Sequence, residues 1–68
     1  MASVTERVAA RVKELRAKRG ISQETLAEET GLNRLTITRL EAAAHPPNVE
    51  TLEKIARALQ VTVAALVK

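Results

Sequence analysis

Hydrophobic residues recur every three or four positions along this chain, in blocks separated by glycine, proline or a small polar residue. The apolar positions of the first block are Val4, Val8, Val12 and Leu15. This spacing places them on one face of a helix. Ser3 and Glu6 have the spacing of a capping box at its start, and Gly20 suits its end. The pattern predicts a helix over about residues 4–19.

The rest of the chain divides into shorter blocks of the same kind. Each of these blocks follows a residue that can cap a helix, namely Ser22, Asn33, Asn48 and Thr62. Two prolines interrupt the chain between the third block and the fourth, where regular structure must stop. We expect helices over about 23–30, 34–43 and 49–59, with a last helical turn after Thr62.

Length and composition bound the fold class. A chain of 68 residues has room for one small core, so we expect one domain over 1–68, an all-α compact five-helix bundle. Hydrophobic residues make up 46% of the sequence and aromatic residues 0%. The core must therefore be aliphatic. The bases of RNA and of single strands stack on aromatic side chains, so their absence counts against binding to those nucleic acids.

Several other classes are excluded by what the sequence lacks. There is no cysteine, which excludes a disulfide scaffold and a thiolate metal site. His45 is the only histidine, and it has no evident partner for catalysis or for a zinc site. No apolar run approaches a membrane span, and charges in the first residues argue against a signal peptide. We expect a cytoplasmic protein that is not an enzyme and needs no metal, cofactor, membrane or small-molecule ligand.

The second and third expected helices are joined by a tight turn. This turn contains Gly31, and Asn33 follows as the cap of the next helix. A helix, a short glycine turn and a second helix, here about 23–43, is typical of the helix-turn-helix arrangement. Many helical bundles contain such a turn, so this pattern alone is weak evidence. The net charge of +3 is equally unspecific.

Three longer runs of sequence carry more information. They extend from Leu15 to Ala27, from Gly31 to Glu41 and from Asn48 to Val61. Together they resemble the helix-turn-helix domains of phage repressors and Cro proteins, the XRE-like family, over about 8–66. The resemblance implies a repressor/Cro-like fold with the third helix, about 34–43, in the major groove of double-stranded DNA. It also implies a small transcriptional regulator of bacterial or phage type, associated with the nucleoid, which acts as a homodimer on a two-half-site operator.

The resemblance assigns contacts with DNA bases to one face of the third helix. The residues concerned are Arg34, Leu35, Thr38 and Arg39. Arginine is the commonest reader of guanine, and leucine can contact the methyl group of thymine. An alternative reading places Arg34 and Arg39 on phosphates and buries Leu35 by packing.

Contacts with phosphates are assigned to residues around that helix. These residues are Ser22, Gln23, Asn33, Thr36, His45 and Asn48. Gln23 would begin the second helix, where free N–H groups and the helix dipole attract an anion. The plainer readings are that Gln23 is an ordinary first-turn residue and that Asn33 is only a cap.

Two features of the third helix concern its orientation and its end. The resemblance implies a salt bridge between Arg16 and Glu41 that orients this helix. The family usually has glycine where Ala43 stands, in a left-handed turn. Alanine there would cost about 1 kcal/mol, so we expect the helix to continue to Ala44 and stop at His45.

Three questions stay open at this point. A surface near the C-terminus can be either a dimer contact or plain core packing; it comprises Val61, Val63, Ala64 and Val67. The fold could also serve a protein-interaction module, such as an antitoxin-like domain, although Arg34 and Arg39 argue against it. The absent aromatics and the run of alanines before His45 would also suit an engineered scaffold, which would change the origin of the protein and leave the inferred DNA binding unchanged.

Overall fold

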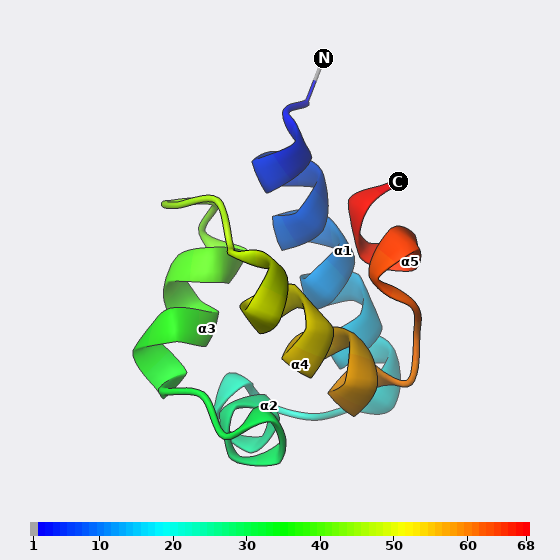
Figure 1. Ribbon diagram of the computed structural model, residues 1–68. Helices are drawn as coiled ribbons and strands as arrows, with labels where there is room; N and C mark the ends of the chain where they lie inside the picture. Colours follow the sequence, from blue (N-terminus) through cyan, green and yellow to red (C-terminus); the bar gives the residue numbers. More distant parts are fainter. Residues whose placement is uncertain (1) are drawn as a thin grey trace.

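The computed structural model describes residues 2–68, which form helices joined by short turns (Figure 1). The helices are α1 Val4–Arg19, α2 Gln23–Thr30, α3 Arg34–Glu41, α4 Val49–Leu59 and α5 Val63–Val67. No strand occurs among residues 2–68. The expected all-α five-helix bundle is confirmed, and the expected bounds of α1, α2 and α4 match those in the structure.

Polar caps fix where the helices begin. At each helix start a side-chain oxygen accepts a hydrogen bond from a backbone N–H of the first turn; the capping residues are Ser3, Ser22, Asn33, Asn48 and Thr62. The capping box of α1 is complete, because the Glu6 carboxylate also accepts a hydrogen bond from the Ser3 backbone N–H, at 3.0 Å. That bond, with a further one to the Ser3 side chain, lowers the pKa of Glu6. These caps satisfy N–H groups that a helix start leaves without a partner.

The end of α3 differs from the sequence prediction. The helix ends at Glu41 rather than at Ala44, and Ala43 adopts a left-handed conformation with φ of 55°. The N–H of Ala43 donates to the carbonyl of Leu40, and the N–H of Ala44 donates to that of Arg39, both at 3.0 Å. This is the hydrogen-bond pattern of a Schellman cap. The prediction was wrong because it counted the cost of a left-handed alanine and omitted the two carbonyls that this turn satisfies.

The strain at Ala43 leads to a stability prediction. We expect Ala43→Gly to raise the free energy of unfolding by about 1 kcal/mol, because glycine adopts a positive φ without a Cβ clash. Urea denaturation monitored by circular dichroism measures this change. Ala44→Gly is the matched control, since Ala44 is not at positive φ and should gain nothing. A loss of stability in both variants would contradict the left-handed turn.

One aliphatic core holds the helices together. Its largest fully buried side chains come from all five helices and are Val8, Val12, Leu26, Ile37, Ile55 and Leu66. Ile37 and Leu40 anchor α3 in this core. Helix α3 lies at one side of the molecule, beside α2 and the turn that leads to α4 (Figure 1). The core therefore fixes the inner face of α3 and leaves its outer face available.

The surface near the C-terminus is largely part of the same packing. Val61, Val63 and Val67 are half-buried against the core, and Ala64 is exposed. Three of the four residues considered for a dimer contact thus have a packing role within one chain. Among residues 2–68, no helix combines the length and the apolar character needed to cross a membrane.

Candidate nucleic-acid interface

The outer face of α3 is the first part of the candidate site. Ile37, Leu40 and Glu41 point inward and are buried, so the side chains on the opposite side of the helix face solvent. Leu35 lies on that side and is 51% exposed. The reading in which packing covers Leu35 is therefore wrong. An apolar side chain presented to solvent beside Arg39 forms a surface suited to a groove of DNA.

Arg34 and Thr38 lie on the side of α3 that faces α2. The Arg34 guanidinium is 3.8 Å from the Glu24 carboxylate, and both side chains are largely exposed. The Thr38 hydroxyl donates a hydrogen bond of 3.0 Å to the side-chain carbonyl of Gln23. An exposed ion pair of this length adds little stability, so Arg34 stays free to leave Glu24 for another partner.

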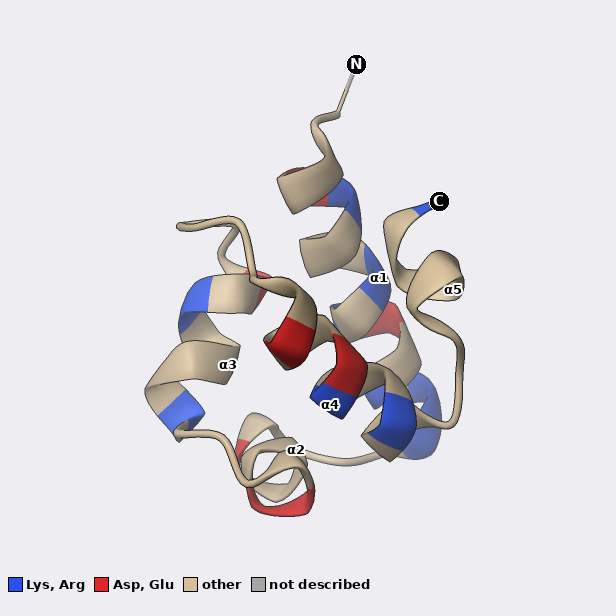
Figure 2. Ribbon diagram, in the orientation of Figure 1, with Lys and Arg blue, Asp and Glu red and all other residues tan. Residues whose placement is uncertain are grey.

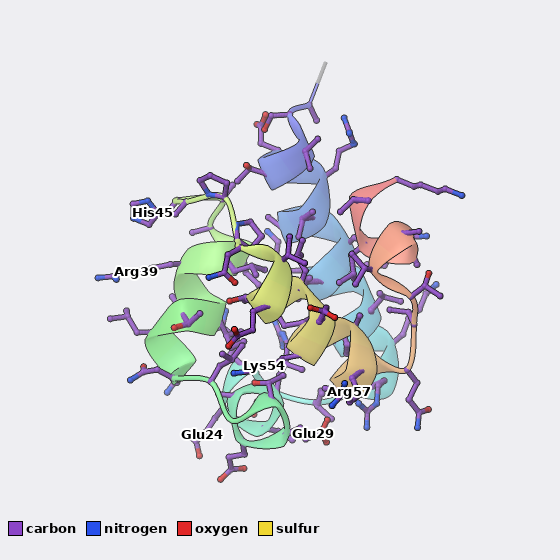
Figure 3. The ribbon with its side chains drawn as sticks, viewed as in Figure 1. Glu24, Glu29, Arg39, His45, Lys54 and Arg57 are labelled. Carbon is purple, nitrogen blue, oxygen red and sulfur yellow. The ribbon has the colours of Figure 1, made fainter. Side chains whose placement is uncertain are left out.

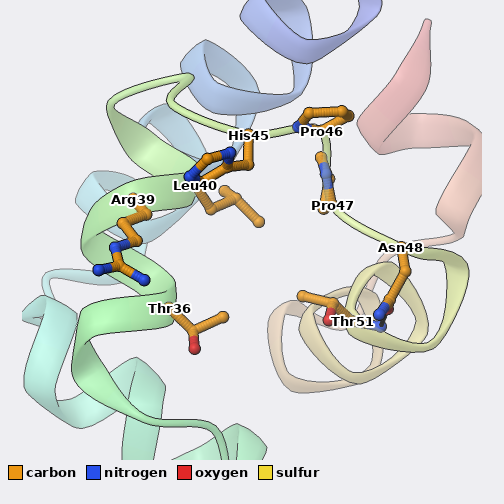
Figure 4. Close-up of a pocket in the computed structure, with 8 residues that line it drawn as sticks. All are labelled: Thr36, Arg39, Leu40, His45, Pro46, Pro47, Asn48 and Thr51. Carbon is orange, nitrogen blue, oxygen red and sulfur yellow. Dashed lines mark hydrogen bonds between the residues drawn. The ribbon is translucent and has the colours of Figure 1, made fainter.

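A pocket of about 230 Å³ lies on the other side of α3 (Figure 4). Its lining residues are Thr36, Arg39, Leu40, His45, Pro46, Pro47, Asn48 and Thr51. The pocket brings together three residues that were assigned to phosphates and one that was assigned to a base. The sequence did not indicate that Thr51 and the two prolines belong to this site, because their position depends on how the turn before α4 folds back on α3. The only signal for Thr51 was its position three residues after the cap Asn48.

Charge is distributed unevenly around this site. Basic residues lie at both ends of α3, whereas α2 carries acidic residues and α4 carries residues of both charges (Figure 2). The one acid of α3, Glu41, is buried. Arg39 and His45 project to the same side of the molecule, away from its body (Figure 3). The outer face of α3 is therefore positive, apart from Glu24 at its edge.

Several of the polar residues assigned to phosphates also act as helix caps. Asn33 Oδ1 accepts from the Leu35 N–H at 2.7 Å, and Asn48 Oδ1 accepts from the Thr51 N–H at 2.7 Å. The Ser22 hydroxyl oxygen accepts from the Thr25 N–H at 3.0 Å. Capping uses an oxygen of each side chain, while the amide N–H groups of Asn33 and Asn48 are still able to donate.

Beneath this surface, a buried carboxylate connects three helices. Arg16 of α1 donates to both oxygens of Glu41, from Nε at 2.7 Å and from Nη2 at 2.9 Å. Arg16 also donates to the Ile21 carbonyl, and Gln23 Nε2 donates to Glu41 at 3.1 Å. The Glu41 side chain is 3% exposed, and its hydrogen bond to Arg16 raises the pKa of that guanidinium. Such a fully bonded ion pair fixes the orientation of the groups it joins.

Removal of this carboxylate gives a second prediction. We expect Glu41→Ala to lower the free energy of unfolding by about 2 kcal/mol, because Arg16 and Gln23 lose their shared acceptor. The loss stays below that of a fully buried pair, since the Arg16 side chain is 21% exposed and can reach water. Urea denaturation gives the value. Glu50→Ala is the control, because the Glu50–Lys54 pair is exposed and should change stability by less than about 0.5 kcal/mol. Equal effects in the two variants would show that the buried pair has no special role.

Comparison with known proteins settles the family. The profile of the family described as helix-turn-helix matches residues 12–66. This chain belongs to the helix-turn-helix family. The family resemblance noted in the sequence is thereby confirmed.

Relatives of this helix-turn-helix protein include named regulators. It is 45% identical over 47 residues to an uncharacterized HTH-type transcriptional regulator of Archaeoglobus fulgidus, a match that covers 69% of this chain and 67% of the relative. It is 37% identical over 60 residues to the immunity repressor protein of Bacillus phage phi105, a match that covers 88% of this chain. The matched region spans 42% of the phage repressor, so more than half of that repressor has no counterpart in this match.

A solved structure supports the fold of the helix-turn-helix protein. The chain superposes with a TM-score of 0.86 on the restriction-modification controller protein C.Esp1396I. The two are 26% identical, and the match covers 97% of this chain and 87% of the controller protein. That controller protein was crystallised as a tetramer in complex with its natural 35 base-pair operator.

Proposed function

We propose that this helix-turn-helix protein binds double-stranded DNA in a sequence-specific manner, as a small transcriptional regulator acting in the cytoplasm. The observation that carries the proposal is the outer face of α3, where Leu35 and Arg39 face solvent while Ile37 and Leu40 anchor the helix in the core. A helix anchored on one face and positive on the other fits the major groove. The operator complex of the controller protein and the name of the phage repressor support the same function.

Two groups of residues would share the contacts. Bases are contacted by Arg34, Leu35, Thr38 and Arg39. Phosphates are contacted by Ser22, Gln23, Asn33, Thr36, His45 and Asn48. Arginine in the groove reads guanine with two hydrogen bonds, whereas the N-termini of α2 and α4 offer backbone N–H groups to phosphates. Regulation of this kind requires no enzymatic activity, and the two named relatives are regulators rather than enzymes.

We further propose that two copies bind together on two half-sites. A helix-turn-helix dimer places its two recognition helices about one turn of DNA apart, which doubles the number of bases that are read. The controller protein forms a tetramer on its operator, which supports binding by more than one copy.

Salt dependence tests the DNA function against the protein-interaction alternative. Fluorescence anisotropy would measure the affinity for a labelled duplex and for its single strand between 50 and 300 mM salt, roughly the range in which phosphate contacts weaken. Arg34 and Arg39 are the cations of the outer face of α3, and neutralisation of about two phosphate charges per copy predicts that log Kd changes with log salt with a slope of about 2. The single strand should bind more weakly than the duplex. Absence of duplex binding at low salt would contradict DNA binding and favour a protein partner.

A further inference from the structure

An unbroken chain of hydrogen bonds connects the interior of the protein to the surface of α3. It begins at the Arg16 guanidinium, which donates to Glu41. Glu41 Oε1 then accepts a hydrogen bond of 3.1 Å from Gln23 Nε2. Gln23 Oε1 in turn accepts a hydrogen bond of 3.0 Å from the Thr38 hydroxyl. The chain ends on an exposed residue in the face proposed to meet DNA.

Chemistry fixes the direction of each bond in this chain. A guanidinium keeps its protons, and a carboxylate paired with it can only accept hydrogen bonds. The Gln23 amide must therefore turn its NH₂ group toward Glu41 and its carbonyl oxygen toward Thr38. That oxygen can only accept, so the Thr38 hydroxyl must donate its single hydrogen to Gln23.

The consequence appears at the surface. A hydroxyl that has given its hydrogen to Gln23 can offer only lone pairs to DNA. It cannot donate to a phosphate oxygen, nor to the acceptor atoms of guanine or thymine. In the major groove the donors that remain are the amino groups of adenine N6 and cytosine N4.

We propose that this chain of hydrogen bonds makes Thr38 an acceptor-only reader of the major groove. The protein then prefers adenine or cytosine over guanine or thymine at the base that Thr38 faces. Gln23 and Glu41 act as positioning residues for this preference, although neither contacts that base. The inference rests on the proposed function and goes further, because it assigns a polarity to one contact.

Selection from a randomised duplex pool tests the proposal with the full chain and three variants, Thr38→Val, Thr38→Ser and Gln23→Met. The wild type should enrich a motif in which one position favours adenine or cytosine by about 3- to 10-fold, the range expected for one hydrogen bond. Thr38→Val removes the hydroxyl with little change in shape and should abolish that preference. Thr38→Ser keeps the hydroxyl and should retain it.

Gln23→Met provides the readout that a purely structural role would not change. It frees the hydrogen of Thr38, so guanine and thymine should become tolerated at the same position, in addition to a general loss of affinity. Thermal melts of all variants verify that they are folded. If Gln23→Met does not fold, the comparison of Thr38→Val with Thr38→Ser still tests whether the Thr38 hydroxyl sets the base preference.

The outcomes separate the two proposals. A wild-type motif that Thr38→Val leaves unchanged, or a Thr38-dependent position that favours guanine or thymine, would overturn this inference and leave the DNA function standing. A wild type that enriches no motif would overturn both.

Discussion

Ile37→Ala is expected to lower the free energy of unfolding by about 3 kcal/mol. Ile37 is 0% exposed and anchors α3 in the aliphatic core, so its truncation leaves a cavity beneath the outer face of α3. A domain of this size has a total stability of roughly 3–10 kcal/mol, so the loss removes a large part of it. Urea denaturation would show the shift, and DNA affinity should fall with it.

Leu35→Ala is the matched control for Ile37→Ala. Leu35 lies two residues away on the same helix but is 51% exposed. Its truncation should change stability by less than about 0.5 kcal/mol and still weaken DNA binding, because the side chain faces the groove. Equal destabilisation by the two variants would contradict the inward and outward faces assigned to α3.

Arg39→Ala is expected to weaken binding to the preferred duplex by about 10- to 100-fold, which corresponds to about 1–3 kcal/mol. Arg39 projects from the outer face of α3 and has no ion-pair partner among residues 2–68 (Figure 3). Its guanidinium is therefore available to DNA without first breaking a salt bridge. If it reads guanine, the preference for guanine at one position should also relax.

The same variant decides between the two readings of Arg39. A contact with phosphate, as its place in the pocket of Figure 4 would also allow, predicts equal weakening on all duplexes with no change of base preference. Arg57→Ala removes the same charge from α4, away from α3, and should weaken binding by less than about 3-fold. A comparable loss in Arg57→Ala would mean that overall charge, rather than the face of α3, governs the interaction.

Much of the fold could be predicted because its signals are local. Ser3, Ser22 and Asn48 mark helix starts through hydrogen bonds within one turn, and Gly20 and Gly31 mark ends where φ is positive. The end of α3 could not be obtained in this way. There the balance lies between the strain of Ala43 and two backbone hydrogen bonds, and residue type alone does not show which of the two is larger.

The candidate site, like the fold, could be predicted only in part from the sequence. The exposed side chains of α3 follow from helical periodicity, since Ile37 and Leu40 fix which face is buried. The bonds of Gln23 to Glu41 and Thr38 join residues that are 18 and 15 positions apart and depend on side-chain conformations across two helices. No sequence pattern encodes those conformations. The pocket beside α3 depends likewise on how the turn before α4 folds back.

The most direct test of sequence-specific binding is the ratio of two affinities at one salt concentration. One duplex carries the motif selected by the wild-type protein, and the other has the same composition in shuffled order. Sequence-specific recognition by α3 predicts that the selected duplex binds at least about 1,000-fold more tightly at roughly 0.1 M salt. Equal affinity for the two duplexes would contradict it, since attraction to phosphates alone does not distinguish one sequence from another.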